Sequence, residues 1–269
     1  MVKLAWASDI HLDCVPDNKW YDYMEEELED CNGLLITGDI SNAKSLLTHL
    51  TKLSTLNTNI YFVLGNHDYW GASFPEVQNQ LKSLPNNLYY LNNHDPIIIN
   101  DTAIVGADGW YDCRYGDFAN PKFIMGDWSR MKEYAGSVTE IYGKLTINSN
   151  LINNVSRQKS KEDTNQLVNK IHNLDKTNIN HIIVLTHFPP YDESSYYQGQ
   201  MSDRYAIPYF TNKYMGENLD MLAEQYKVNF TTLCGHTHEA RTYHRMNNLV
   251  VHTAFANYGF PCIYTALEF

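Results

Sequence analysis

Five short segments of the sequence carry side chains that can bind a metal ion. They are Asp9-Ile10-His11, Gly38-Asp39, Gly65-Asn66-His67-Asp68, His187 and Gly235-His236-Thr237-His238. The donors are carboxylate and amide oxygens and imidazole nitrogens, and none is a thiolate. Such a mixture suits transition metals such as Mn, Fe or Zn, whereas Ca and Mg prefer oxygen alone and structural zinc usually takes thiolates. The segments therefore predict a transition-metal site.

The donors are too numerous for one tetrahedral ion. Two ions about 3.5 to 4 Å apart that share a bridging carboxylate would use them, and this arrangement holds the attacking and leaving oxygens during phosphate ester hydrolysis. The candidate residues are Asp9, His11, Asp39, Asn66, His67, His187, His236 and His238.

Each motif alone is weak, because Asp-x-His occurs often by chance and Gly-Asp after a strand is often only a turn. The combination is informative because polar residues repeatedly follow an apolar run. Gly38, Gly65 and Gly235 each precede a candidate ligand. A glycine there allows the backbone to turn sharply and leaves room for an ion.

Short apolar runs must position these side chains. Val2–Ala7, Gly33–Thr37 and Ile60–Leu64 read as buried strands, separated by amphipathic helices over Asp17–Asp30 and Ala43–Leu56. Strands that alternate with helices pair in parallel through right-handed crossovers, so their carboxyl ends lie along one edge. Ligands of open α/β sheets bind along that edge.

The later chain continues this pattern with a helix over Ser73–Leu84, which a Ser73/Glu76 capping box would start, and a helix near Glu217–Tyr226. Further strands are predicted at Leu88–Leu91, Pro96–Ile99, Thr102–Val105, His181–Thr186 and Val228–Cys234. The tail alternates like antiparallel strands that close the sheet, at Thr242–His244, Leu249–Phe255 and Ile263–Phe269. Residues 139–173 are polar and predicted to be largely helical.

Composition limits the functional classes. The 269 residues, 43% of them hydrophobic, suffice for a packed core, and no apolar run is long enough to span a membrane. A net charge of −11 without a Lys/Arg cluster disfavours nucleic acid as a partner. The five cysteines form no CxxC pair, which favours a reducing cytoplasm. We expect a soluble cytoplasmic enzyme whose oligomeric state is open.

The combined motifs resemble those of the calcineurin-like metallophosphoesterase family: DxH, GD, GNHD, a later His and GHxH. The resemblance covers residues 2–68 and 181–255. It implies an α/β fold, a four-layer α/β/β/α sandwich with two central mixed β-sheets. We expect residues 1–269 to form a single domain, with a partly helical insertion at about 109–175.

The resemblance also implies residue roles. Asp9, His11 and His238 would hold one metal ion, and Asn66, His187 and His236 the other, with Asp39 bridging both. His67 would be the catalytic imidazole that binds no metal and faces the scissile phosphate. Asp68 could accept an imidazole N–H and fix its orientation, although a turn or a helix cap explains this residue equally well.

Substrate selectivity is expected in the insertion, which can overhang the site. Arg114 could bind a phosphate, and Trp110 or Tyr111 could stack on a base or an aryl group, although packing is the stronger interpretation for these aromatics. Secondary candidates are Trp128-Ser129-Arg130, Tyr191, Tyr196 and Tyr197. We interpret Asn257-Tyr258-Gly259-Phe260, which only vaguely matches a family loop near the metals, as a simple strand connection.

Three functional hypotheses follow. The first is a hydrolase of small phosphate mono- or diesters, with nucleotides among its possible substrates. The second is a phosphoprotein phosphatase or a nuclease of the same fold; the acidic charge argues against the nuclease. The third is a protein-binding scaffold without catalysis, which would have no need of His67 or the metal ligands.

Overall fold

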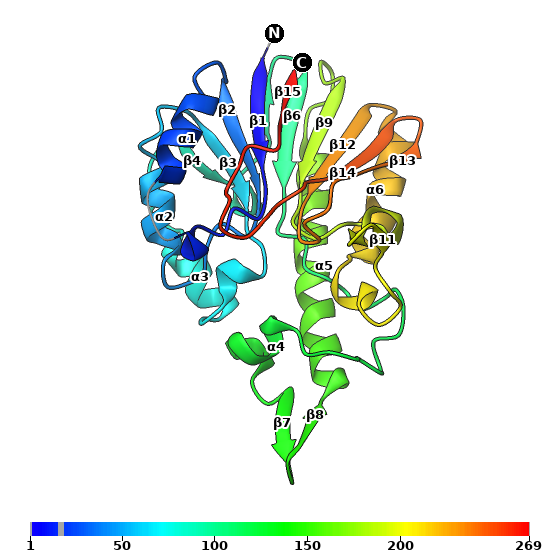
Figure 1. Ribbon diagram of the computed structural model, residues 1–269. Coiled ribbons are helices and arrows are strands. Elements are labelled where there is room, and N and C mark those ends of the chain that lie inside the picture. The colour runs from blue at the N-terminus through cyan, green and yellow to red at the C-terminus, as the bar shows by residue number, and fades with distance from the viewer. Residues whose placement is uncertain (1, 16–18, 269) are drawn as a thin grey trace.

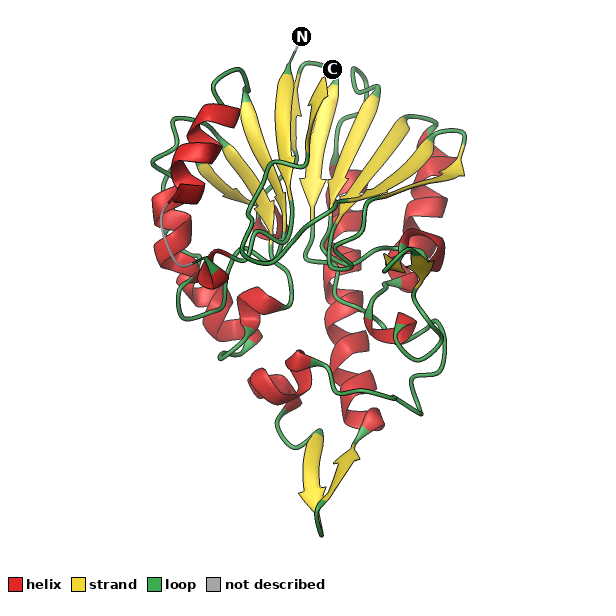
Figure 2. Cartoon of the chain, in the orientation of Figure 1, coloured by secondary structure: helices red, strands yellow, loops and turns green. Residues whose placement is uncertain are grey.

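Two β-sheets packed face to face form the centre of the molecule (Figure 1, Figure 2). The computed structural model describes residues 2–15 and 19–268. The first sheet has the strand order β15-β1-β2-β3-β4, with bounds Thr265–Glu268, Lys3–Ala7, Gly33–Thr37, Ile60–Val63 and Leu88–Tyr90. The second has the order β13-β14-β12-β9-β6-β5, with bounds Arg241–Met246, Leu249–Thr253, Asn229–Cys234, His181–Leu185, Thr102–Gly106 and Ile97–Ile99.

Helices cover the outer face of each sheet. On the first sheet lie α1 (Lys19–Glu27), α2 (Leu46–Leu53) and α3 (Phe74–Gln80). On the second lie α5 (Ser149–Asn173) and α6 (Lys213–Tyr226). The four-layer α/β/β/α sandwich that the motifs implied is therefore confirmed, and both central sheets mix parallel and antiparallel pairs.

Side chains that alternate along the strands build the layers. In β1, Ala5 and Ala7 pack toward the helices, whereas Leu4 and Trp6 lie in the cluster between the sheets. In β9, Ile182 and Val184 pack toward α5 and α6. Because successive strand residues point to opposite faces, a run with apolar residues at every position is buried on both. This explains why the strands of this chain read as continuous apolar runs.

The predicted edge is present in both sheets. β1, β2 and β3 are parallel neighbours, and so are β6, β9 and β12. The carboxyl ends of five parallel strands, three in one sheet and two in the other, carry the predicted metal-binding segments.

Local signals were reliable where they were strong. The capping box of Ser73 and Glu76 is formed, and α3 begins at Phe74, directly after Ser73. The helix predicted over Asp17–Asp30 corresponds to α1; Asp17 lies outside the described residues, as does Phe269 of the predicted last strand.

Residues 139–173 are largely helical, as predicted, because α5 occupies most of them, and a hairpin of β7 (Val138–Ile141) and β8 (Lys144–Ile147) precedes that helix. The second half of α5 packs on the second sheet through Leu167 and Ile171. One expectation needs correction. The tail does not close one sheet, because β14 pairs in parallel with β12 whereas β15 pairs with β1 of the other sheet.

The remaining short elements are α4 (Gly126–Arg130) and the paired strands β10 (Tyr196–Tyr197) and β11 (Gln200–Met201). Figure 1 shows α4 and the β7–β8 hairpin on the side of the molecule to which the carboxyl ends of the parallel strands point. No helix of the described ranges 2–15 and 19–268 has the length and apolar character to cross a membrane.

Candidate metal centre

Seven predicted ligands converge where the carboxyl ends of the two sheets meet. They form what we call the metal cluster: Asp9, His11, Asp39, Asn66, His187, His236 and His238. Their side chains are buried, with only His238 partly exposed. The expectation that separate strand ends bring these residues together therefore agrees with the structure.

One half of the metal cluster contains Asp9, His11, Asp39 and His238, which can each offer one ligand atom within 4.8 Å of the others. Nε2 of His238 lies 3.2 Å from Oδ1 of Asp9 and 3.3 Å from Nε2 of His11. Nε2 of His11 lies 3.8 Å from Oδ2 of Asp39.

The other half contains Asp39, His187 and His236, again with ligand atoms within 4.8 Å of one another. The amide oxygen of Asn66 joins them, 3.2 Å from Nε2 of His187 and 3.1 Å from Nδ1 of His236. Oδ1 of Asp39 lies 3.5 Å from Nε2 of His187. The two carboxylate oxygens of Asp39 thus face the two halves separately.

These separations fit bound metal ions. Two atoms that bind the same ion at about 2.1 Å each lie about 3.0–3.4 Å apart. The separations around His238 and Asn66 fall in this range, and those from Asp39 to His11 and His187 are slightly longer, at 3.8 and 3.5 Å. Burial lowers the pKa of His11 to about 3, although Asp9 opposes this. A neutral imidazole has the free electron pair that a metal needs.

Backbone strain is concentrated at the same residues. Five of the ligands have positive φ angles between 40° and 69°, a conformation that costs an L-residue roughly 1–2 kcal/mol. They are Asp9, His11, Asp39, His236 and His238. Such strain is stored mainly at functional sites, where the surrounding structure imposes it.

The neighbouring glycines leave space for the ligands. A Cβ on Gly65 would lie 2.1 Å from Oδ1 of Asp39, and one on Gly235 would lie 2.2 Å from Oδ2 of Asp9. Neither position can therefore hold any other residue without displacing a ligand. The predicted reason for the glycines agrees with the geometry.

Hydrogen bonds from outside the metal cluster orient its members. Nδ1 of His187 lies 2.8 Å from the carbonyl oxygen of Thr37, so the ring donates there and turns Nε2 toward Asp39 and Asn66. Nδ2 of Asn66 donates to Asp127 over 2.8 Å, which turns its amide oxygen toward the histidines. These two ligands are thus each fixed by a group on a different element.

The two carboxyl groups of the metal cluster have pKa values shifted in opposite directions. Burial would raise the pKa of Asp9, but His238, His187 and His11 together lower it below its usual range. Burial and the nearby carboxylates Asp9 and Asp68 raise the pKa of Asp39 well above its usual range. Cations bound here would reverse the effect on Asp39, since an adjacent positive charge favours the carboxylate form.

Comparison with known proteins identifies the family of this chain. Residues 2–240 match the calcineurin-like phosphoesterase family. The chain belongs to this family. The match spans most of the chain and includes both halves of the metal cluster.

Individual relatives are distant. An uncharacterized protein of Acanthamoeba polyphaga mimivirus is 22% identical over 253 residues, which are 87% of this chain and 84% of that protein. The crystal structure of phosphopantetheinyl hydrolase from Mycobacterium tuberculosis has a TM-score of 0.67 at 14% identity and covers 96% of this chain and 90% of that one.

A dimetal phosphatase from Danio rerio has a TM-score of 0.57 at 12% identity and covers 94% of this chain and 87% of that one. At these identities the two structures show that the fold is shared.

His67 lies beside the metal cluster of this phosphoesterase-family chain. Its Nε2 is 3.9 Å from Oδ2 of Asp39, and its ring stacks on Trp70 with 3.4 Å between the ring centres. Burial, with His11 and His187, lowers the pKa of His67 to about 2, so the ring is neutral at pH 7 in the free protein.

Asp68 holds backbone rather than an imidazole. Its two oxygens accept the N–H groups of Ser41 and Gly65, each over 2.8 Å. The carboxylate therefore ties the loop after β2 to the loop after β3, which carry Asp39 and Asn66. The interpretation of Asp68 as a turn residue is the one that these contacts support.

Packing was the stronger interpretation of the two aromatics of the insertion, and the structure agrees with it. Trp110 and Tyr111 are fully buried, with Trp110 packed against Tyr69 and Phe74, so the alternative of stacking on a substrate is excluded for both. Arg114 makes paired hydrogen bonds of 2.6 and 2.9 Å to Glu217 instead of facing the metal cluster. The aromatic density of this segment is packing, because indole and phenol rings fill the gap between the insertion and the core.

Two neighbours of the site were missed. Tyr258, predicted to lie in a simple strand connection, stacks on His11 with 4.3 Å between ring centres, and its hydroxyl lies 3.5 Å from Nε2 of His67. Asp127 of α4 is fully buried and accepts hydrogen bonds from Asn66 and from Nε1 of Trp70. Nothing in the local sequence marks Asp127; the loop with Tyr258 offered a weak family likeness.

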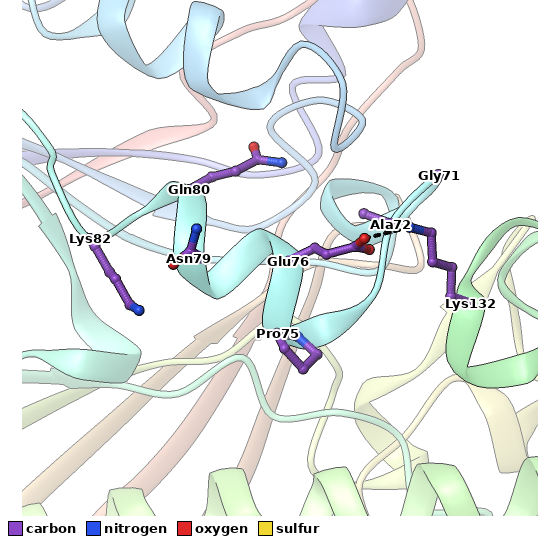
Figure 3. Close-up of a pocket in the computed structure, with 8 residues that line it drawn as sticks. All are labelled: Gly71, Ala72, Pro75, Glu76, Asn79, Gln80, Lys82 and Lys132. Carbon is purple, nitrogen blue, oxygen red and sulfur yellow. Dashed lines mark hydrogen bonds and ion pairs between the residues drawn. The ribbon is translucent and has the colours of Figure 1, made fainter.

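A pocket of about 280 Å³ opens onto the metal cluster. Residues of the overhanging segment and of β10 complete its wall, namely Met125, Gly126 and Tyr197. A separate pocket of about 720 Å³ beside α3 is drawn in Figure 3. It contains no member of the metal cluster, and Figure 3 shows its Glu76 turned toward Lys132, with which it forms an ion pair. We therefore place the chemistry at the smaller pocket.

Proposed function

We propose that this protein is a binuclear metal-dependent phosphoesterase that hydrolyses small phosphate mono- or diesters. The observation that carries the proposal is the position of Asp39, whose Oδ2 faces His11 and whose Oδ1 faces His187. One carboxylate placed between two sets of ligands is what a pair of ions requires.

In this proposal Asp9, His11, Asp39 and His238 hold one ion, and Asp39, Asn66, His187 and His236 hold the other. Nitrogen and oxygen ligands without thiolates suit Mn, Fe or Zn. When bound, such ions supply Lewis acidity that activates water and neutralises charge on a phosphoryl group. The chain's own residues must then orient the ester and assist the leaving group.

His67 is the residue we assign to the leaving group. As a neutral ring it can donate an N–H hydrogen bond from Nε2. A bound phosphate dianion would favour the protonated ring, because an adjacent negative charge raises the pKa of an imidazole. His67 can then give a proton to the departing ester oxygen, a contribution of about 10²–10⁴ in rate. Trp70 holds the ring in place by stacking.

The test is activity with a paired metal measurement. Purified protein loaded with Mn, Fe or Zn should release p-nitrophenol from p-nitrophenyl phosphate or from its bis ester. His67→Ala should lose about 10²–10⁴ in kcat while retaining both ions. His94→Ala, at an exposed histidine, is the matched control and should retain full activity.

The outcomes separate the hypotheses. Metal-loaded protein that hydrolyses no phosphate ester in a broad panel would overturn the proposal in favour of a binding scaffold. The ratio of rates on the mono- and bis ester distinguishes a phosphatase from a phosphodiesterase. A formal net charge of −11 supports a small substrate, such as a nucleotide, over a nucleic acid. Five free cysteines support a reducing compartment such as the cytoplasm.

A further inference from the structure

A second pocket adjoins the metal cluster on the His67 side. It has a volume of about 670 Å³ and shares His67, Trp70 and Tyr258 with the smaller pocket at the metal cluster. Its remaining wall comes from the loops after β1 and β2, from Gly71 and from α4, through residues Asp13, Cys14, Asn42, Lys44, Gly71 and Arg130. We call this the side pocket.

The side pocket presents two cations to solvent. Lys44 and Arg130 are exposed, and neither has an ion-pair partner in the part of the chain that the structure describes. Three other arginines do form ion pairs: Arg114 with Glu217, Arg204 with Asp117 and Arg245 with Asp220. In a chain with a net charge of −11, cations left available beside a reactive centre point to an anionic ligand.

The acid in the side pocket does not neutralise both cations. Asp13 is its single carboxylate, and Oδ2 of Asp13 accepts a hydrogen bond of 3.0 Å from Asn42. The charged groups facing the space are thus two cations and one anion, next to the neutral ring of His67.

Arg130 is held in position from two sides. Its guanidinium carbon lies 4.1 Å from the centre of the Trp70 ring, and its carbonyl oxygen accepts the N–H of Gly71 over 2.8 Å. Trp70 is itself fixed by the stack on His67 and by the hydrogen bond to Asp127. A single indole ring therefore contacts both the proposed proton donor and the cation. A cation positioned in advance loses little conformational entropy on binding an anion.

The direction of the leaving group connects these observations to the reaction. His67 protonates the ester oxygen, so the departing group must pass His67, and the side pocket opens there. We propose that Lys44 and Arg130 bind a second anionic group, a phosphate or a carboxylate, on the leaving-group part of the substrate. The preferred substrates are then phosphate esters whose leaving group carries a second anion. The Trp70 ring, which contacts both His67 and Arg130, sets the separation between that anion and the scissile bond. The inference rests on the proposed phosphoesterase function.

Three matched esters test it by release of inorganic phosphate from the metal-loaded enzyme. They are propyl phosphate, 3-phosphooxypropanoate and propane-1,3-diyl bisphosphate, which differ only in the second anion. Wild type should show a KM about tenfold lower for at least one doubly anionic ester than for propyl phosphate. The preferred ester identifies the second anion as carboxylate or phosphate.

Variants of the side pocket give the decisive comparison. Arg130→Gln and Lys44→Gln should each bring the KM for propyl phosphate and the KM for the preferred doubly anionic ester to nearly the same value. Arg130→Lys should retain part of the wild-type preference for the doubly anionic ester. Lys82→Gln is the control, because Lys82 is an exposed lysine in the separate pocket, where Figure 3 shows it away from the pair of Glu76 and Lys132. It should leave the ratio of the two KM values and the rates unchanged.

Failures of the two proposals are distinguishable. If wild type hydrolyses propyl phosphate but treats all three esters alike, the side pocket has no such role and the phosphoesterase proposal stands. If both Gln variants keep the wild-type preference for a doubly anionic ester, the side pocket likewise has no such role and the phosphoesterase proposal stands. If metal-loaded wild type hydrolyses none of the three, nor p-nitrophenyl phosphate or its bis ester, the proposed function fails and this inference fails with it. Hydrolysis of the bis ester alone overturns this inference and leaves the phosphoesterase proposal standing.

Discussion

Two buried polar clusters among the described residues differ in how their charges are satisfied. The first is the metal cluster. The second, which we call the support cluster, consists of Tyr69, Tyr90, Asp108, Lys159 and Asp163. It joins the ends of β3, β4 and β6 to α5.

The support cluster supplies its own donors. Asp108 accepts the hydroxyls of Tyr69 and Tyr90 over 2.6 and 2.7 Å and the N–H of Leu64 over 2.9 Å. Nζ of Lys159 lies 2.5 Å from Asp163 and 3.6 Å from Asp108. Burial alone would lower the pKa of Lys159, but the two carboxylates raise it. A buried cation paired in this way needs nothing from outside the chain.

The metal cluster lacks such an internal cation. It contains two carboxylates, an amide oxygen and four imidazoles, and in the described residues the groups that pair with Asp9 and Asp39 are imidazoles rather than a lysine or an arginine. Burial of polar atoms is therefore a poor guide to function by itself. The balance of donors and acceptors distinguishes a cluster that supports the fold from one that awaits cations.

The largest contrast is expected from Asp39→Asn. Loss of the bridging carboxylate should remove bound metal and lower kcat/KM by roughly a thousandfold or more, since the ions contribute several kcal/mol to the transition state. The metal-free variant should be no less stable than metal-free wild type, because Asp9 and Asp68 repel the charge of Asp39. Metal analysis, kinetics and thermal unfolding check this. A variant that retains two ions and full activity would contradict the assigned bridge.

The support cluster should respond in the opposite way. Lys159→Met leaves Asp108 and Asp163 buried without their cation and should cost about 3–5 kcal/mol in the free energy of unfolding, measured by urea denaturation. Bound metal should remain in the folded fraction. Lys161→Met on the exposed face of α5 is the control and should change stability little. Equal effects of the two substitutions would remove the distinction between the clusters.

The support cluster should also make the free energy of unfolding depend on pH, by up to about 3 kcal/mol. Burial raises the pKa of Asp163 to about 6, against an ordinary value of 3.8. Between these values the folded protein keeps a proton that the unfolded chain has lost. Its stabilising contribution is therefore complete below about pH 4 and is lost as the pH rises to about 6.

Asp163→Asn isolates this effect because it removes the titrating group. Plotted against pH between 4 and 7, the free energies of unfolding of wild type and variant, obtained from denaturation curves, should converge or cross as the pH rises. Parallel stability curves would assign the pH dependence to other groups.

The smallest predicted effect concerns Asp127, which lies outside the metal cluster and orients one of its ligands, Asn66. Asp127→Ala removes the acceptor that orients Asn66 and should lower metal affinity or kcat by about 10–100-fold, the usual size for a group that positions a ligand. Asp127→Asn keeps an acceptor oxygen and should lose less. Metal titration with a competing chelator measures the difference. Unchanged affinity in the alanine variant would show that the fold orients Asn66 without Asp127.

Much of this site followed from local sequence. An apolar run that ends in a polar residue marks a strand end, and parallel pairing of β1, β2 and β3 brings such ends together. The ligand types of Asp9, Asp39 and His187 could therefore be predicted without coordinates. The capping box of α3 was equally local, because its two partners are three residues apart.

Other features depend on contacts between distant segments. Asp127 reaches Asn66 across 61 positions in the chain, and Tyr258 reaches His67 across 191. The burial of Trp110 and Tyr111 and the return of β15 to β1 have the same origin. Residue types and spacing determined which chemistry the chain can perform, because strand ends and ligand atoms are local properties. Which side chains surround that chemistry was decided only by tertiary packing, because a contact between remote segments leaves no periodic trace in either of them.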